Sequence, residues 1–473
     1  MTMKYSRDIK VYASYDVVVC GGGPAGCAAA LSARREGLST LLVEESGSLG
    51  GMAVSGLVSQ WLGGRTQEGE WVVGGLFKEI ADSAASEGSA VIPYLVPGKD
   101  YHPYGWYNWF IHGVPLDSSR VAYMLDKKMS EAGVDVLLFT KFVDTRIVEG
   151  RITDVVLAAR EGLVSVKAKA VVDATGNADV AFASGCPVVK GREGDGKMAP
   201  SSLVFHVYDV DTVALTKAIE KNRDPKFRDL ISELRQKGIW TFPYDIFICT
   251  KLVFGSEYFV NTIRLVGFDG TDSASLSSGM RKGREEVFEL MKILNEYFPG
   301  FKDAKVKSVA PSLGIRETRK IKGDFVLRVD DLMRQEEFDD TIGFSMYGWD
   351  LPDPDKPSVQ PFASDLKSGF KPKVTKGLYT PIPYRVMIPS LVDNLVCAGR
   401  CVSVEGQVLG PVRVMAPCMA MGEAAGLACS WVVGEGKPFS RVDTVGLREK
   451  LRSYGCIVDV SGLPEIHPRV DQV

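Results

Sequence analysis

The chain has 473 residues and a net charge of −3, with 45% hydrophobic and 24% charged residues. This length exceeds one ordinary hydrophobic core, so we expect two or three domains. The composition is that of a soluble globular protein, and the small net charge excludes a strong attraction to nucleic acid or an anionic membrane. No run of about 18 apolar residues is present, so we expect no membrane partner.

The cysteines and histidines predict neither disulfides nor a metal site. Residues 1–16 lack the apolar segment of a secretory signal. Without such a signal, the nine cysteines, an odd number, favour a reduced, cytoplasmic location. The four histidines are widely separated, and the cysteines do not form the short-spaced groups that hold zinc or iron–sulfur clusters.

A glycine motif joins the first predicted strand to the first predicted helix. Val17–Cys20 is apolar and β-branched, as is typical of a buried parallel strand. Three glycines follow with the spacing Gly-x-Gly-x-x-Gly. They permit a sharp turn, a close backbone approach to a pyrophosphate, and tight packing of a helix whose N-terminus favours phosphate. The predicted pyrophosphate site comprises Gly21, Gly23, Pro24, Ala25 and Gly26.

The next predicted strand ends in an acidic residue. Residues 39–45 read STLLVEE, and Glu44 lies at about the distance at which an acid binds ribose hydroxyls. An acid here disfavours a 2′-phosphate, and therefore NADP. The order of strand, glycines, helix, strand and acid predicts a dinucleotide site; the alternative is a glycine-rich turn in an unrelated α/β protein. These residues do not distinguish NAD from FAD.

Between residues 115 and 160 the pattern predicts a helix and a hairpin. The helix is expected to begin at Asp117 or Ser118 and to end at Gly133, with a strand after it. Two alternating strands then flank Glu149-Gly150, which is a hairpin signal.

Three further segments bear on the choice of cofactor. Gly50-Gly51 lies just beyond the acid, where flavoproteins extend their longer cofactor and an NAD domain has only a loop. Val171–Ala174 predicts a strand that ends in Thr175-Gly176. A last buried strand ends in Gly399-Arg400, and a long helix of small residues begins near Val412–Ala416.

Together these segments resemble FAD-dependent oxidoreductases of the glutathione-reductase-like superfamily. The sequence is most similar to the branch that includes proteins resembling the flavin subunit of heterodisulfide reductase. There, a glycine motif, a DATG strand and a segment like NLVCAGR…RVMAPCMAMGEAAG build one FAD site. The resemblance covers about residues 15–433. It implies resident FAD and an α/β fold, namely a Rossmann-like three-layer FAD-binding domain (parallel sheet, β-meander and helices) with an α+β substrate domain.

The resemblance also assigns cofactor contacts residue by residue. The glycine motif would hold the pyrophosphate, Glu44 the adenosine ribose, and Val143 the adenine through its backbone. The long helix that begins near Val412–Ala416 would place its N-terminus near the flavin and stabilise reduced flavin through its dipole. The alternative is that this segment is a packed core helix. Arg400 departs from the Asp of many relatives, and could contact phosphate instead. The remaining implied contacts are Gly50, Gly51, Met52, Ala174, Thr175, Gly176, Gly399, Arg413, Val414 and Met415.

The domain boundaries follow from these motifs and from composition. We expect a discontinuous FAD-binding domain at 12–65, 115–205 and 376–435, an aromatic-rich insertion at 66–114, a substrate domain at 206–375 and a C-terminal extension at 436–473. We find no second strand with a Gly-x-Gly-x-x-Gly motif, so a separate NAD(P)H domain is not expected.

Four residues are candidates for catalysis. Arg316 and Arg319, in LGIRETRKIKGDF, could bind carboxylates. However, residues three apart in a strand face opposite sides, and a structural ion-pair strand is the alternative. His112, in the aromatic segment 101–113, could act as acid or base, or the segment could be an aromatic core or dimer patch. Tyr384 could reach the flavin or be a packed core tyrosine.

The predicted function is that of an FAD-dependent oxidoreductase that transfers hydride between a small organic substrate and tightly bound FAD. The alternatives are a flavin electron-transfer subunit working with an iron–sulfur partner, and a non-catalytic flavin-bound scaffold. The substrate, the electron acceptor and any homo-oligomer are left open. A catalytic disulfide between Cys397 and Cys401 is disfavoured, since their spacing is not Cys-x-x-Cys.

Overall fold

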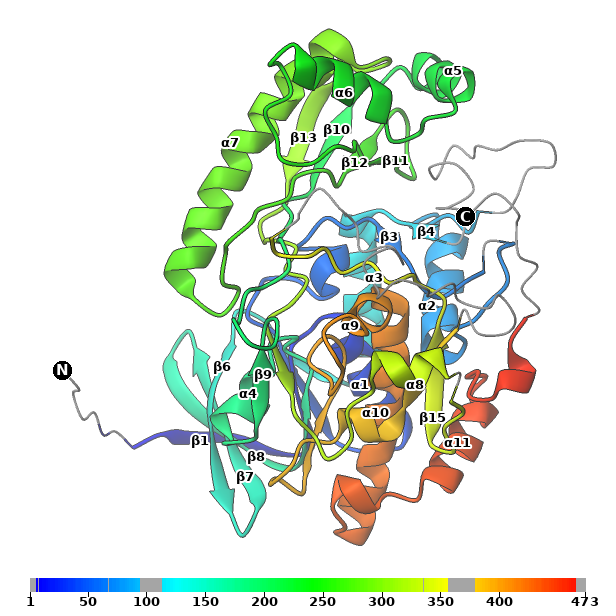
Figure 1. Cartoon of the computed structure of the whole chain (residues 1–473). Coiled ribbons are helices and arrows are strands. Elements are labelled where there is room, and N and C mark those ends of the chain that lie inside the picture. The colour runs from blue at the N-terminus through cyan, green and yellow to red at the C-terminus, as the bar shows by residue number, and fades with distance from the viewer. Residues whose placement is uncertain are drawn as a thin grey trace.

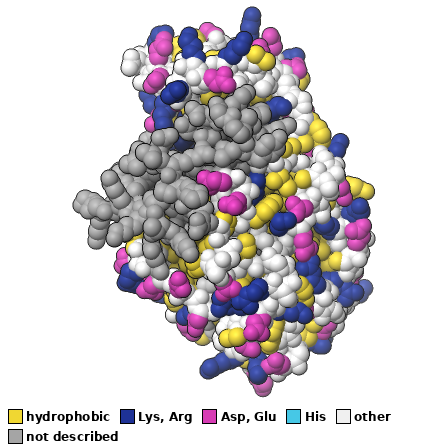
Figure 2. Space-filling view, turned by 90° about the vertical axis from the view of Figure 1, so that its right-hand side faces the viewer, with side chains coloured by type: hydrophobic (Ala, Val, Ile, Leu, Met, Phe, Trp, Pro, Cys, Tyr) yellow, Lys and Arg dark blue, Asp and Glu magenta, His cyan; other side chains and the backbone are white. Residues whose placement is uncertain are grey.

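The computed structural model describes residue 6 and residues 8–66, 68–93, 113–334, 336–355 and 379–464. It consists of a larger body, which contains the N-terminal strand and the C-terminal helices, and a smaller body above it (Figure 1). Each body has its own hydrophobic core. On the face shown in Figure 2, acidic and basic side chains are interspersed, as the small net charge leads one to expect.

The larger body is built on a seven-stranded sheet with the order β5-β2-β1-β8-β7-β6, in which β17 also pairs with β8. β5, β2, β1, β8 and β17 run parallel. The apolar half of β1, from Val17 to Cys20, is fully buried, as predicted. The parallel strands are β1 (Lys10–Cys20), β2 (Thr40–Val43), β5 (Asp135–Leu137), β8 (Gly162–Asp173) and β17 (Leu395–Cys397).

An antiparallel meander extends the same sheet. β6 (Lys141–Val148) pairs with β7 (Arg151–Ala159), which pairs with the first half of β8. Glu149 and Gly150 between them have φ values of 49° and 74°, the left-handed pair of a tight hairpin turn. The predicted hairpin is confirmed, and β8 belongs to both the meander and the parallel sheet.

Helices cover the parallel sheet. α1 (Pro24–Arg35) and α10 (Met415–Glu435) pack backbone to backbone, since a Cβ added to Gly422 would lie 2.0 Å from the Ala25 carbonyl oxygen. Among the described residues, α10 is the one helix long and apolar enough to cross a membrane, and most of it is buried inside the protein as a core helix. The other helices of this body are α2 (Gly75–Ser86), α3 (Ser118–Ala132), α4 (Asp179–Ala183), α8 (Val329–Met333), α9 (Leu409–Val412) and α11 (Thr444–Ser453).

The predicted bounds of α3 agree with its caps. The Asp117 carboxylate accepts a hydrogen bond from the Arg120 N–H at the N-terminus, and Gly133 ends the helix with a φ of 73°. Side-chain capping and a left-handed glycine are the usual signals for these two ends.

The smaller body is a four-stranded antiparallel sheet with the order β11-β12-β10-β13. Helices pack on one of its faces around an aromatic core that includes Phe227, Trp240, Phe247 and Phe298. Its elements are β10 (Phe205–Tyr208), α5 (Thr212–Asn222), α6 (Arg228–Gln236), β11 (Cys249–Lys251), β12 (Tyr258–Val260), α7 (Ser273–Tyr297) and β13 (Lys305–Val309).

The chain returns to the larger body before residue 375. The core of the smaller body draws on residues from 203 to 315. Strands within 319–345 then pair with strands outside that core, and the predicted end of the substrate domain at residue 375 lies outside the described residues. This segment contains two short strands. β14 (Arg319–Ile321) pairs with β9 (Val188–Lys190), and β15 (Thr341–Ser345) pairs with β16 (Thr380–Pro383). A further short pair, β3 (Gln60–Trp61) with β4 (Val114–Pro115), lies near the junction of the two bodies.

Candidate functional site

The first glycine turn leaves an open space at the N-terminus of α1. Gly21 has a φ of 104°, and a Cβ there would lie 2.5 Å from the Ala174 carbonyl oxygen. A Cβ on Gly26 would lie 1.7 Å from the Gly21 carbonyl oxygen, whereas one on Gly23 would meet nothing within 4 Å. No side chain caps α1, which begins at Pro24. Free N–H groups beside this open space fit a pyrophosphate.

The second glycine pair docks on the first. The Gly50 N–H donates to the Gly22 carbonyl oxygen at 2.8 Å, and a Cβ on Gly51 would lie 2.9 Å from the Cα of Gly23. Met52 follows in the short 3-10 helix η1 (Gly51–Ala53). Gly50 and Gly51 therefore border the same space as the first motif, and the cofactor contact of Met52 stays a prediction.

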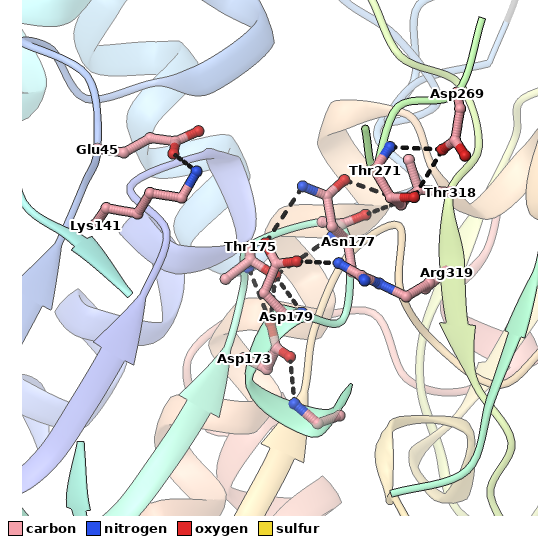
Figure 3. Close-up of polar contacts among 12 residues, drawn as sticks. Glu45, Lys141, Asp173, Thr175, Asn177, Asp179, Asp269, Thr271, Thr318 and Arg319 are labelled. Carbon is pink, nitrogen blue, oxygen red and sulfur yellow. Dashed lines mark hydrogen bonds and ion pairs between the residues drawn. The ribbon is translucent and has the colours of Figure 1, made fainter. Parts of the chain in front are cut away.

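Glu44 is held by backbone groups at the end of β2. Its carboxylate accepts hydrogen bonds from the Gly22 N–H at 2.7 Å and the Ser46 N–H at 2.8 Å, and the residue is partly exposed. Two carboxylate oxygens can accept about four hydrogen bonds, so acceptor capacity is left for ribose hydroxyls. Lys141, at the start of β6, pairs with the neighbouring Glu45 at 3.2 Å (Figure 3). This contact places the start of β6, the strand that contains Val143, beside Glu45.

Asp173 organises the loop that follows β8. The Thr175 hydroxyl and N–H both donate to Asp173 Oδ1, at 2.7 and 3.1 Å, and the Ala181 N–H donates to Oδ2 (Figure 3). Burial raises the pKa of Asp173 to about 6, against the lowering effect of these hydrogen bonds. The loop of Ala174 and Gly176 is therefore fixed from beneath, next to Gly21.

Two arginines hold the same loop from outside. Arg400 donates through Nη2 to Asn177 Oδ1 at 2.6 Å and through Nη1 to the Ile315 carbonyl oxygen at 2.9 Å. Arg319 donates to the Asn177 carbonyl oxygen at 3.0 Å and pairs with Asp179 (Figure 3). These two hydrogen bonds use two of the five N–H donors of Arg400, and its contact with the cofactor stays a prediction. Gly399, beside it, has a φ of 93° and packs on Ala25.

The N-terminus of α10 lies next to a cavity. No side chain caps α10, and its Ala416 N–H donates to the Leu62 carbonyl oxygen at 3.3 Å. Just before the helix, Arg413 Nη2 donates to the Asp350 carbonyl oxygen at 2.6 Å. Leu62 and Asp350 both line the cavity, so it adjoins the end of α10 that the resemblance places at the flavin ring.

The cavity has a volume of about 50 Å³ and lies between the two bodies. Its apolar wall mixes side chains from the larger body with Phe259 and Ile248 of the smaller one. Its polar wall contains two arginines, an aspartate, a tyrosine, an asparagine and a glutamine. The lining residues are Val58, Gln60, Leu62, Ile248, Phe259, Asn261, Arg264, Arg316, Tyr347 and Asp350.

The charged groups of the cavity influence one another. Burial raises the pKa of Asp350, but attraction by Arg413, Arg316 and Arg264 outweighs it and holds the pKa below its ordinary value. Tyr347 Oη donates to Asp350 Oδ2 at 2.9 Å, and burial raises the pKa of this tyrosine. The cavity therefore holds an ionised carboxylate beside a protonated phenol.

The structure places the predicted catalytic residues in different parts of the protein. Arg316 lines the cavity, whereas Arg319 is engaged with Asp179 and Asn177, as the ion-pair alternative describes. Tyr384 is buried in the core, and its hydroxyl donates to the Phe439 carbonyl oxygen at 3.1 Å, as the core alternative describes. His112 and most of the aromatic segment lie outside the described residues.

Sequence reasoning missed most of the polar wall. Arg264, Tyr347, Asp350 and Asn261 were not candidates. One signal was available for Arg264, which stands in the apolar run YFVNTIRLVGF and is only 5% exposed. A charged residue in a buried run is uncommon unless it has a partner or a ligand. No comparable local signal marks Tyr347 or Asp350.

We call the space bordered by Gly21, Gly23, Gly26, Gly50 and Gly51 the cradle. Such a glycine-lined nucleotide site in a parallel sheet, together with a β-meander and a second helix N-terminus, defines an FAD-binding Rossmann-like fold. The chain belongs to the family described as FAD dependent oxidoreductase, which it matches over residues 16–451. FAD is its cofactor, and the residues at the cradle fit it.

Curated relatives are distant or short. The chain is 28% identical to an uncharacterized protein in the nifH2 5′ region of Methanosarcina barkeri, over 38% of this chain and 92% of that one. It is 45% identical to dihydrolipoyl dehydrogenase of Trypanosoma brucei brucei over 11% of each chain. It is 28% identical to digeranylgeranylglycerophospholipid reductase 2 of Methanopyrus kandleri over 34% of this chain and 37% of that one. The chain thus spans less than two thirds of the last two relatives.

Solved structures that resemble the chain are also distant. A geranylgeranyl bacteriochlorophyll reductase-like protein from Thermoplasma acidophilum is 15% identical, with a TM-score of 0.44 over 93% of this chain and 83% of that one. The p-nitrophenol 4-monooxygenase PnpA from Pseudomonas putida is 12% identical, with a TM-score of 0.45 over 94% and 87%.

Proposed function

We propose that the protein transfers hydride between tightly bound FAD and a small organic substrate held in the cavity between the two bodies. The observation that carries this proposal is the position of the cavity, which adjoins the N-terminus of α10 through Leu62 and Asp350. When bound, FAD supplies the hydride acceptor or donor. We also infer membership of the glutathione-reductase-like branch, which the order of the glycine, DATG and CAGR motifs supports.

The residues of the chain have three tasks in this function. The dipole of α10 and the N–H of its first residue, Met415, stabilise negative charge beside the cavity. Val58, Leu62 and Phe259 form an apolar wall that excludes water from the substrate. Asp350 is ionised and can accept a substrate proton, while the hydroxyl of Tyr347 fixes the position of its carboxylate.

The first experiment tests whether the protein carries FAD and then whether a small compound reduces or oxidises it. The purified protein should be yellow, and denaturation should release FAD. Small alcohols, amines and acids are then screened anaerobically for bleaching of the flavin, and the dithionite-reduced protein is screened with carbonyl and enoyl compounds for return of the colour. At least one compound is expected to change the redox state of the flavin. If none does in either direction, the hydride-transfer proposal is wrong.

The variant Asp350→Asn tests the proton acceptor. With the compound found in the screen, its bleaching rate should fall about 100-fold, because a positioned base contributes that order of acceleration. Asp339→Asn is the matched control, since the Asp339 side chain is 92% exposed. Both variants should retain FAD. An unchanged rate in Asp350→Asn would assign the proton acceptor elsewhere.

A further inference from the structure

Two arginines reach the cavity from different parts of the chain. Arg264 follows β12 and is almost fully buried, whereas Arg316 precedes β14 and is partly exposed. Within the described part of the chain, Arg316 donates one hydrogen bond, from Nη1 to the Pro200 carbonyl oxygen at 2.5 Å. A guanidinium carries five N–H donors, so Arg316 has donors left for a ligand.

Positive charges lie close to one another around Arg316. Arg413 and Arg264 both act electrostatically on Arg316, opposed by Asp350, whereas Arg264 also interacts with Asp245. Burial lowers the pKa of Arg316 to about 9, and repulsion by Arg413 and Arg264 adds to the effect. The positive charge of Arg316 is therefore disfavoured even with Asp350 nearby, and a ligand that brings further negative charge to Arg316 would stabilise it.

The shape of the cavity restricts the anion. The volume of about 50 Å³ leaves room for few heavy atoms, and Val58, Leu62 and Phe259 supply an apolar side. A planar guanidinium matches the two oxygens of a carboxylate. Asn261 also lines the cavity, and its Oδ1 atom is buried with no hydrogen-bond partner among the described residues. That atom would accept a hydrogen bond from a hydroxyl or amino group on the ligand.

We propose that the cavity binds a small organic acid, whose carboxylate is held by Arg316 with Arg264 beside it and whose second polar group faces Asn261. This names the substrate class of the site used in the proposed function, and in that respect it rests on that function. The binding step itself requires no redox chemistry, so it can be measured separately.

The test uses the oxidised holoenzyme and a change in the flavin absorbance spectrum on binding. The probes are propionate and lactate, each compared with its neutral amide. Both acids should bind more tightly than their amides, and lactate more tightly than propionate because its hydroxyl can donate to Asn261. Amides that bind as tightly as the acids would overturn the proposal, as would inorganic phosphate binding more tightly than either acid.

Substitutions at Arg316 locate the binding. Arg316→Gln should raise the lactate dissociation constant about 10- to 100-fold, because a hydrogen bond to a charged group is lost. Arg316→Lys, which keeps the charge without the fork, should fall between. Arg284→Gln is the control, since Arg284 is exposed on α7. FAD content and the unfolding midpoint show whether each variant folds. Equal affinity in Arg316→Lys and the wild type, or in a folded Arg316→Gln, would overturn the assignment.

The two proposals fail in different ways. If neutral compounds bleach the flavin while neither acid binds, the acid proposal is wrong and hydride transfer stands. If the acids bind at Arg316 but no compound changes the flavin redox state in either direction, the anion site stands and the proposed function is wrong.

Discussion

The cofactor cradle is formed mainly by backbone, whereas the cavity beside it is formed mainly by side chains. The cradle consists of backbone, where glycines at 21, 23, 26, 50 and 51 bring chain segments so close that most added methyl groups would collide. The cavity is lined by large charged and aromatic side chains from both bodies. Backbone geometry suits a cofactor of fixed structure, whereas side chains can change from one relative to another. The two sites should therefore respond differently to substitution.

The largest effect is expected within the cradle itself. Gly26→Ala should destabilise the protein by about 3 kcal/mol and abolish FAD binding, because its Cβ would lie 1.7 Å from the Gly21 carbonyl oxygen. Gly23→Ala meets nothing within 4 Å and has a φ of −72°, so its apoprotein should be within about 1 kcal/mol of the wild type. Thermal unfolding of the apoproteins measures this difference.

The same pair separates steric from functional demands. Although Gly23→Ala should fold, its methyl group would occupy the space left for the pyrophosphate, so its FAD dissociation constant should rise about 10-fold or more, equivalent to ~1.4 kcal/mol. If Gly23→Ala retains FAD as firmly as the wild type, the pyrophosphate does not lie at the N-terminus of α1.

The second prediction concerns a buried carboxyl group, that of Glu423. Glu423 of α10 accepts a hydrogen bond from the Leu76 N–H at 2.8 Å, and burial raises its pKa to about 7. The unfolded chain ionises this group at about pH 4.5, so the folded state loses up to about 3 kcal/mol of relative stability as pH rises from about 4.5 to about 7. Glu423→Gln should therefore gain stability relative to the wild type over that interval.

Denaturant unfolding at about pH 5 and about pH 8 checks this sign. Glu435→Gln, at the exposed end of the same helix, is the matched control. A constant difference for Glu423→Gln would mean that this carboxyl ionises alike in the folded and unfolded chain.

The smallest effect is expected where the two bodies meet. Ser59 Oγ lies 3.0 Å from both His206 Nε2 and Ser118 Oγ, and all three side chains are buried. Ser59→Ala should cost about 1 kcal/mol of unfolding free energy and leave FAD content unchanged. Ser86→Ala, on the exposed end of α2, is the control. Loss of FAD in Ser59→Ala would show that the junction, and not the glycines alone, sets the cradle.

The cradle could be predicted from sequence because its information is local. Glycine spacing, the preceding apolar strand and Glu44 follow one another within about 30 residues, and each has a direct steric or hydrogen-bonding reason. The cavity could not be predicted, because Arg264, Arg316 and Asp350 meet only through tertiary structure. The interval of three residues did separate Arg316 from Arg319, but did not reveal which of them would face the cavity.

The packing of α1 against α10 has a consequence for synthesis of the chain. Ser32 donates to the Glu423 carbonyl oxygen, and Gly422 and Gly426 rest against the backbone of Ala25 and Ala29. The nucleotide site therefore begins in one segment and is closed by another that is synthesised much later. A nascent chain must keep its glycine turn and apolar α1 face without this partner until residue 426 has emerged, so FAD can be captured in full only after α10 has been made.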